Sequence, residues 1–182
     1  MNQQITAFPV PKSGKISLVV APRDIVPSLM TMLSALALRG RVIVVDGGNC
    51  FDGYALARAL RRQTRHVQAA LKQVWLSRAF TCYQMVAMLA ELPIDGTPVI
   101  VLDMLSTFLD ENVNLTKRQR LLESSLNLLR RISAEAPVAI WSRVRSTPNG
   151  EDQKLLTHLL EASHDIWELE TPAIPDHQLT LF

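Results

Sequence analysis

Short runs of valine, isoleucine and leucine alternate along the chain with longer stretches in which apolar residues recur every three or four positions. The short runs predict strands at residues 16–21, 41–46, 73–79, 98–103, 138–144 and 165–170. The first five runs lack a strict alternation of apolar and polar residues, which is typical of strands that are covered on both faces.

The longer stretches predict helices at residues 24–38, 54–71, 82–92 and 117–134. Thr81 is a suitable N-cap for the third helix, and the series from Thr116 to Gln119 resembles a capping box at the start of the fourth. Because strands and helices alternate, the sequence predicts an α/β fold, with a mainly parallel sheet and helices on both of its faces. We expect an N-terminal arm at 1–15, one domain at 16–170 and a C-terminal tail at 171–182.

Composition and charge narrow the classes of protein to which the chain can belong. Of its 182 residues 48% are hydrophobic, which argues against disorder, and a net charge of +2 is too small to indicate nucleic-acid binding by bulk electrostatics. Cys50 and Cys82 lack the spacing of metal ligands and fit reduced thiols. The uncharged run at 25–38 is too short to span a bilayer, so we expect a cytoplasmic protein with no membrane partner.

The turn after the first strand lies where a phosphate-binding loop, G-x-x-x-x-G-K-[ST], would occur. Its glycines would bring backbone N–H groups to the phosphate, its lysine would neutralise charge, and its hydroxyl would hold magnesium. Here Ala21 and Val26 replace the glycines, Pro27 replaces the lysine, and only Ser28 remains. We expect Asp24 to cap the following helix and to repel a phosphate there. The sequence therefore predicts no nucleotide binding at this turn.

The ordered series of segments over 16–170 resembles the ATPase core of the RecA/RadA superfamily. The segments are PVIVLD ending at Asp103 (a Walker B strand), SRAFTCYQ at 77–84, VIVVDGGNCFDGYALARAL at 42–60, and the helix and strand that begin at Leu115. This resemblance implies a RecA-like three-layer fold. The chain departs from active members at three places: Gly48 replaces their catalytic glutamate, and Ser142 and Arg143 replace the N-Q pair that senses the γ-phosphate.

These departures imply a member of the fold without ATPase activity and without a cofactor, in which nucleotide binding elsewhere stays open. Non-hydrolysing relatives of the ImuA and SulA types act by binding partners. The first expectation is therefore an adaptor in bacterial DNA repair and the SOS response, with a translesion polymerase or a RecA-type protein as partner. The alternatives are a SulA-like inhibitor that binds the division protein FtsZ and a divergent NTPase that uses Asp103 and Ser28.

The last five residues, QLTLF, resemble the bacterial sliding-clamp motif QL[SD]LF. Gln178 would hydrogen-bond at the mouth of the clamp pocket, while the three apolar side chains of Leu179, Leu181 and Phe182 would fill its subsites. The same residues alternate between apolar and polar, so a terminal edge strand is the competing interpretation.

Two groups of arginines are candidates for a basic contact surface. Arg58, Arg61, Arg62 and Arg65 have the spacing of one stripe on a helix, which is either a solvated face or a contact for phosphates or an acidic partner. Arg143 and Arg145, with a predicted loop at 146–153, occur where recombinases carry a DNA-binding loop. The loop of this chain is short and includes two acids, so direct DNA contact is expected to be weak or indirect. Self-association is a further expectation, because many RecA-fold proteins use a neighbouring subunit.

Overall fold

The computed structural model describes residues 11–110, 112–143 and 150–169. Its strands are β1 (Ile16–Ala21), β2 (Val42–Asp46), β3 (Val74–Arg78), β4 (Val99–Leu102), β5 (Val138–Arg143) and β6 (Asp165–Glu168). Its α-helices are α1 (Val26–Ala37), α2 (Gly53–Arg61), α3 (Val67–Leu71), α4 (Cys82–Glu91), α5 (Leu115–Glu135) and α6 (Gly150–Glu161). Two 3-10 helices, η1 (Arg23–Ile25) and η2 (Met104–Phe108), follow β1 and β4.

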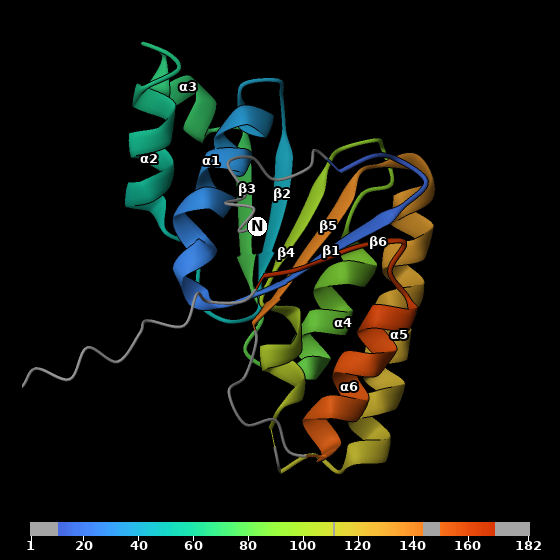
Figure 1. The fold of residues 1–182 in the computed structure, drawn as a ribbon. Coiled ribbons are helices and arrows are strands. Elements are labelled where there is room, and N and C mark those ends of the chain that lie inside the picture. Colours follow the sequence, from blue (N-terminus) through green and yellow to red (C-terminus); the bar gives the residue numbers. More distant parts are fainter. Residues whose placement is uncertain (1–10, 111, 144–149, 170–182) are drawn as a thin grey trace, which may run out of the picture.

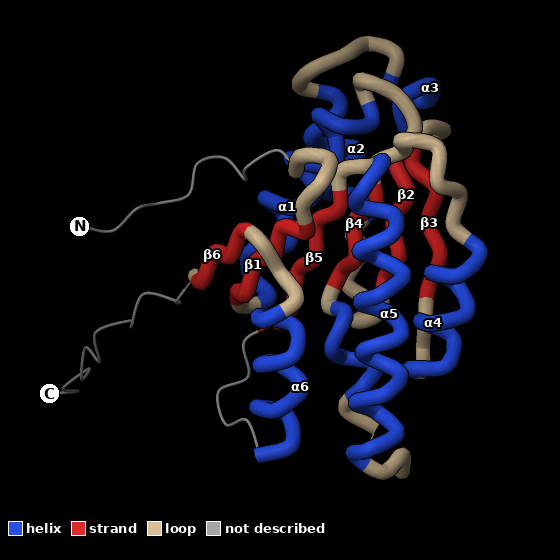
Figure 2. Tube along the Cα trace, turned by 90° about the vertical axis from the view of Figure 1, so that its right-hand side faces the viewer, coloured by secondary structure: helices blue, strands red, loops and turns tan. Residues whose placement is uncertain are grey.

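The strands of the described residues form one parallel sheet in the order β3-β2-β4-β5-β1-β6. Helices α1, α2 and α3 lie on one side of the sheet, and α4, α5 and α6 lie on the other (Figures 1 and 2). The predicted α/β class, with a parallel sheet between two layers of helices, is therefore confirmed, and the arrangement is consistent with a RecA-like three-layer fold.

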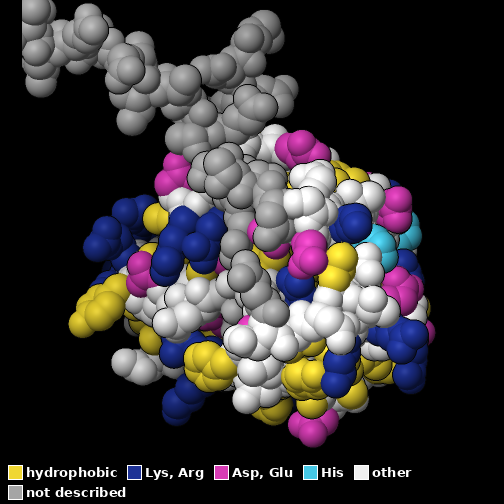
Figure 3. Space-filling view, turned by 90° about the horizontal axis from the view of Figure 1, so that it is seen from below, with side chains coloured by type: hydrophobic (Ala, Val, Ile, Leu, Met, Phe, Trp, Pro, Cys, Tyr) yellow, Lys and Arg dark blue, Asp and Glu magenta, His cyan; other side chains and the backbone are white. Residues whose placement is uncertain are grey.

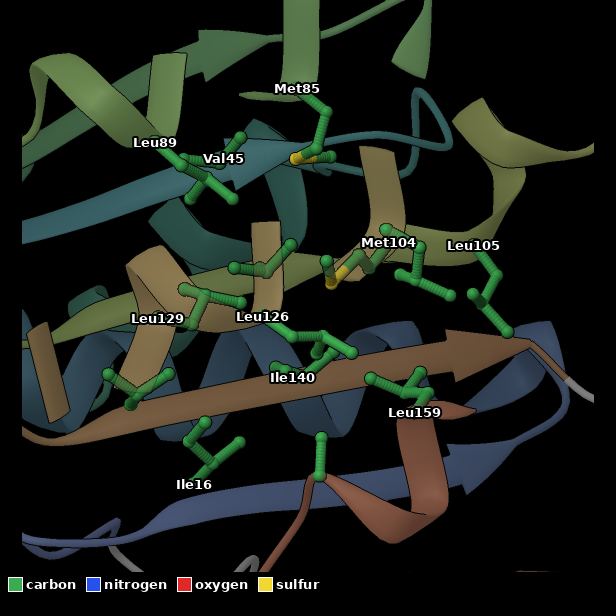
Figure 4. Packing of buried hydrophobic residues seen from close by; sticks show 14 of the residues in the cluster. Ile16, Val45, Met85, Leu89, Met104, Leu105, Leu126, Leu129, Ile140 and Leu159 are labelled. Carbon is green, nitrogen blue, oxygen red and sulfur yellow. The ribbon is translucent and has the colours of Figure 1, made fainter. Parts of the chain in front are cut away.

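Alternate residues of each central strand face opposite helix layers, which explains why the strand sequences are apolar throughout. In β1, for example, Ile16 and Leu18 pack towards α4, α5 and α6, whereas Val19 packs towards α1. Figure 4 shows the first of these cores, where Leu126 and Leu129 of α5 lie against Ile140 of β5. Each fully buried leucine contributes roughly 1.5–3 kcal/mol of hydrophobic stabilisation.

Strand β3 corrects one expectation. The sequence predicted that it would be covered on both faces, but all its residues except Val74 are exposed. The reason is its position at the edge of the sheet, where only β2 pairs with it. Trp75 remains 51% exposed, and the guanidinium of Arg41 lies 4.1 Å from the centre of its ring. An apolar run alone does not distinguish a central strand from an edge strand.

Two details of the helices also differ from the sequence predictions. The helix expected at 54–71 is two helices, because α2 ends at Arg61 and α3 begins only at Val67. Helix α6 begins at Gly150, inside the stretch that was predicted to be a loop. Within the described residues no helix has both the length and the apolar character that crossing a bilayer requires.

The predicted helix caps were partly right. The side chain of Thr81 accepts a hydrogen bond from Gln84 N at 3.2 Å, so the N-cap of α4 is confirmed. The capping box at Thr116 is wrong, because α5 begins two residues earlier than predicted and Asn114 caps it. Asp24 does not cap α1 either: it lies within η1, and the N-cap residue of α1 is Ile25.

Candidate functional site

The carboxyl ends of four neighbouring strands bring the sequence-predicted site residues together. In a parallel sheet all strands finish at the same edge, and ligands of α/β proteins bind there. Strands β2, β4, β5 and β1 are consecutive in the sheet, so the β1–α1 turn, the end of β2, Asp103 after β4 and Arg143 at the end of β5 form one site. Three of the four segments that resemble RecA thus contribute to one place, namely the 42–60 segment, the strand ending at Asp103 and the strand ending at Arg143.

The β1–α1 turn has the form of a short helix and not of a loop wrapped around a phosphate. Pro22 has an extended backbone (φ −66°, ψ 169°) and leads directly into the 3-10 turn η1. Pro27 lies in the first turn of α1, where it removes one of the free N–H groups that a helix offers to an anion. Ser28, the one residue retained from the motif, is exposed. The turn therefore lacks the converging N–H groups of a phosphate loop.

A tryptophan anchors the beginning of this turn. The indole of Trp141, 1% exposed, comes from β5 and donates from Nε1 to the carbonyl oxygen of Ala21 at 3.1 Å. On the same side of the sheet it packs in one apolar cluster with Val26 and Leu29. The vestigial glycine positions Ala21 and Val26 are thus buried parts of the core, and the turn is held by apolar packing.

Asp46, at the end of β2, organises the loop that follows it. Its buried carboxylate accepts hydrogen bonds from Cys50 N (2.9 Å) and Phe51 N (2.9 Å), and Arg78 Nε lies 3.5 Å away. This loop leads into α2, whose N-cap is Asp52. The carboxylate of Asp46 is therefore engaged by backbone N–H groups and a cation of the protein itself.

Asp103, the Walker B-like residue, forms an ion pair with Arg143. Asp103 is 3% exposed and has a left-handed backbone (φ 48°), which aspartate tolerates better than most residues. Arg143 Nη2 lies 2.7 Å from Asp103 Oδ2, and Arg143 N donates to Asp103 Oδ1 at 3.1 Å. Burial acts to lower the pKa of Arg143, but the charge of Asp103 and the hydrogen bond to it raise the pKa of Arg143 overall. The guanidinium of Arg143 is therefore held in its charged form beside Asp103.

Cys50 completes this group of side chains. Its Sγ lies 3.7 Å from Arg143 Nη2 and 4.0 Å from Asp103 Oδ2, and its thiol donates to the carbonyl oxygen of Gly48 at 3.2 Å. Burial raises the pKa of Cys50, and the negative charge of Asp103 raises it further. A protonated, buried thiol is a poor nucleophile, so the site contains no activated cysteine.

Gly48 is the residue that the resemblance to RecA aligns with the catalytic glutamate of active members. A Cβ atom placed on Gly48 would lie 2.6 Å from Asp103 Cβ and closer still to Asp103 Oδ2. These contacts are shorter than any that real Cβ atoms make, so the present position of Asp103 admits only glycine at 48. The absence of a side chain at 48 and the position of the Asp103 carboxylate are therefore coupled.

A shallow hollow of about 480 Å³ opens beside this group, between the β1–α1 turn and the β2–α2 loop. Its lining includes Arg23, Pro27, Cys50, Asp52 and Tyr54. Within the residues that the structure describes, no three histidine, cysteine, aspartate or glutamate side chains are close enough to hold a metal ion. Both strand-end carboxylates of this site, Asp46 and Asp103, are engaged by groups of the protein itself.

The basic candidates are separated by the fold. Arg58, Arg61 and Arg62 are exposed on or directly after α2, whereas Arg65 lies beyond the end of that helix and so does not continue its stripe. Arg143 is directed at Asp103 instead of an outer surface. Arg145 and the clamp-like residues Gln178, Leu179, Leu181 and Phe182 lie outside the described residues.

Sequence reasoning did not identify the structural roles of Asp46, Cys50 and Trp141. A signal was present for the first, since an aspartate directly after a buried strand belongs to the carboxyl edge of the sheet. No pattern in the sequence indicated that the indole of Trp141 would bond to Ala21, which is 120 positions away.

Comparison with known proteins adds no assignment. No protein-family model matches the chain, and a search of curated proteins finds no significant match. The function proposed for the chain therefore rests on its own residues and their geometry.

Proposed function

We propose that this chain is a non-hydrolysing adaptor with a RecA-like fold, which acts in bacterial DNA repair and is recruited to the sliding clamp through its C-terminal residues. The main support for the absence of nucleotide hydrolysis in this proposal is the ion pair between Arg143 and Asp103. In an NTPase of this kind the acid at the end of the Walker B strand helps to hold Mg²⁺. Here the guanidinium of Arg143 provides the positive charge beside that acid.

The rest of the site supports the same proposal. Nucleotide hydrolysis needs a cradle for the phosphates, a metal ion and a group that orients the attacking water. Pro27 replaces the lysine of the cradle, and Gly48 replaces the carboxylate that would orient the water. Since the structure leaves no room for a side chain at 48, the site does not regain that carboxylate by a single substitution.

Recruitment to the clamp is inferred from the QLTLF sequence. Burial of Leu179, Leu181 and Phe182 would contribute roughly 1.5–3 kcal/mol for each side chain. The costs of association and of ordering a peptide offset much of this, which leaves an affinity in the micromolar range. A contact of this strength recruits a protein effectively when a second contact acts together with it.

Calorimetry with a bacterial sliding clamp tests this part. We expect the intact chain to bind with micromolar affinity, and a chain ending at His177 not to bind. A third variant, Leu181→Ala with Phe182→Ala, keeps the length of the tail and should also lose binding. Absence of binding by the intact chain, or equal binding by all three, would reject recruitment through the tail.

A nucleotide titration tests separately whether the chain binds or hydrolyses a nucleotide. A ligand present far above its Kd raises the melting temperature of the protein that binds it. We expect no shift with millimolar ATP and Mg²⁺ and no release of phosphate above the rate in buffer. A shift that disappears in an Asp103→Asn variant would instead support the divergent NTPase.

The surface around β3 and α4 favours a folded protein as a further partner. Five of the large apolar side chains that the structure shows as exposed occur within residues 75–94, namely Trp75, Leu76, Phe80, Tyr83 and Ile94. Exposure of aromatic and apolar side chains around this edge of the sheet is typical of protein interfaces. It suits a translesion polymerase, a RecA-type protein or a second copy of this chain, and it equally suits FtsZ, which keeps the SulA-like function as the second candidate. Inhibition of FtsZ assembly by the chain ending at His177 would favour that candidate.

A further inference from the structure

The corner formed by α1, α2 and α3 concentrates exposed positive charge. The cations follow α1, lie on α2 or directly after it, and follow α3. We call this surface the basic corner, and its residues are Arg39, Arg58, Arg61, Arg62, Arg65 and Lys72. All six side chains are exposed, and none takes part in an ion pair among the described residues. Charge that is exposed and unpaired at this density is available to a partner.

Contacts between the elements show that the basic corner is one surface. The α1 and α2 helices pack against each other, and Gln63 Nε2 donates to Ser34 Oγ at 2.6 Å. Val42 N donates to the carbonyl oxygen of Gln73 at 2.9 Å, which brings the end of α3 next to the segment that follows α1. These contacts lie at the ends where β2 and β3 begin, opposite the edge that holds Asp103 and Arg143 (Figure 1).

The charge is distributed unevenly along the chain. Residues 39–73 contain seven lysines and arginines and only two acids, whereas the rest of the chain carries a net charge of −3. Of the two acids, Asp46 is buried and Asp52 caps α2 at its far end. By contrast, acidic and basic side chains are interspersed over the described surface in the view from below (Figure 3). The net charge of +2 therefore conceals a strongly basic corner.

The side chains around these cations distinguish between two kinds of anionic partner. A protein interface needs an apolar centre, usually with aromatic residues. Between residues 55 and 74 no large apolar side chain is exposed, and beside Arg39 the one exposed apolar side chain is Leu38, which is aliphatic and 41% exposed. The exposed neighbours of the cations are mostly polar and include Gln63, Gln68 and Gln73, together with His66. Arginine, lysine and glutamine are the side chains that contact phosphate oxygens in protein–DNA complexes.

We propose that the basic corner binds the phosphate backbone of nucleic acid without reading its sequence. This contact goes beyond the adaptor function and does not depend on the tail. The exposed arginines at the end of α2 form charge-assisted hydrogen bonds with phosphate oxygens, and each contact releases condensed counterions. Together with a clamp contact of micromolar strength, such a surface holds the chain on DNA through two weak attachments.

Fluorescence anisotropy with labelled DNA of mixed sequence, both duplex and single-stranded, tests the proposal on the full chain. The key variant carries Arg58→Gln, Arg61→Gln and Arg62→Gln. The control variant carries Arg120→Gln, Arg130→Gln and Arg131→Gln on α5, which removes the same charge from exposed positions on the other side of the sheet. Thermal unfolding of both variants checks that they fold.

We expect the full chain to bind DNA at about 50 mM salt, with an affinity that falls steeply up to about 200 mM. The α2 variant should bind at least about tenfold more weakly, and its slope of log K against log salt should be smaller by up to about 3. The α5 variant and a chain ending at His177 should bind as the full chain does. Failure of the tail to bind the clamp would leave these expectations unchanged.

Three results would overturn the proposal. The first is the absence of DNA binding at about 50 mM salt. The second is an equal loss of binding in the α2 and α5 variants, which would show that only total charge matters. The third is binding of poly-glutamate as tight as that of DNA and equally sensitive to the α2 substitutions, which would assign the basic corner to an acidic protein.

Discussion

The guanidinium of Arg143 lies 2.7 Å from the carboxylate of Asp103, although 40 positions separate the two residues in the sequence. They are brought together because β4 and β5 are neighbours in the sheet and both end at this edge. Arg143 also donates its backbone N–H to the same carboxylate. The charge of a buried acid at the end of a Walker B-like strand is thus compensated by an arginine of the same protein.

Removal of Arg143 should destabilise the fold through the acid it leaves behind. In Arg143→Ala the carboxylate of Asp103, 3% exposed, loses its cationic partner. We expect the free energy of unfolding to fall by about 1–3 kcal/mol, less than for a fully buried pair, because the side chain of Arg143 is 34% exposed. Urea unfolding measures this loss.

Asp103→Asn supplies the second arm of a double-mutant cycle. The double variant should lose less stability than the sum of the two single variants, because the amide carries no charge that needs a partner. Arg130→Ala, which breaks the exposed pair with Glu123, serves as the control and should change stability by at most about 1 kcal/mol. Strict additivity in the cycle would contradict a coupled pair.

Gly48 should tolerate no side chain. We expect Gly48→Ala to lower the free energy of unfolding by about 1–3 kcal/mol, because the new Cβ overlaps the carboxylate of Asp103. Gly53→Ala is the matched control: its Cβ would meet no atom closer than 3.7 Å, and the first turn of α2 favours alanine over glycine. The control should be neutral or more stable by up to about 1 kcal/mol. Equal stability of the two variants would show that the site adapts to a side chain at 48.

The two buried thiols should make the protein less stable at alkaline pH. Burial raises the pKa of Cys50 and of Cys82 above the usual 9.0. As pH rises through about 9, the unfolded chain releases thiol protons that the folded chain still holds, so the unfolded state binds fewer protons and folding stability falls. Urea unfolding near neutral pH and near pH 10 measures this decrease.

A variant with Cys50→Ala and Cys82→Ala separates the thiols from the lysines and tyrosines that titrate in the same range. Its stability should fall less between the two pH values than that of the unchanged chain. An identical decrease in both proteins would mean that the thiols do not contribute.

The start of α5 offers a test of which residue caps it. The side chain of Asn114 accepts a hydrogen bond from Lys117 N at 2.9 Å. Asn114→Ala should therefore lower the free energy of unfolding by about 1 kcal/mol, whereas Thr116→Ala, within the first turn of the helix, should change it by less than about 0.5 kcal/mol. The opposite order would return the cap to the position that the sequence predicted.

Hydrophobic periodicity predicted the strands closely and the helix ends less well. The strand expected at 16–21 is β1 residue for residue, because its apolar run ends sharply at Lys15 and Pro22. The helix expected at 54–71 is broken after Arg61, although apolar residues recur on both sides of the break. The local pattern of apolar residues indicates which face of a helix is buried. Where the helix is interrupted depends instead on how α2 and α3 pack around the end of α1.

At the candidate site, too, some features could be predicted from the sequence and others could not. The absence of glycine and lysine from the β1–α1 turn was readable from the sequence, since those residue types are what the chemistry requires. The partner of Asp103 was not readable, because it depends on which strands are neighbours. Arg143 was expected on an outer surface, yet the register that places β5 beside β4 directs its side chain to the acid.

By itself the sequence determined the α/β class, the alternation of buried strands with amphipathic helices and the absence of phosphate-loop glycine and lysine residues from the β1–α1 turn. These are properties of residue type and spacing, which act over a few positions. The tertiary structure alone decided that β3 is an exposed edge, that Asp103 is paired with Arg143, that Gly48 has no space for a side chain and that six cations share one corner. Each of these depends on contacts between segments far apart in the chain, and such contacts follow from the order of the strands and the packing of helices on the sheet.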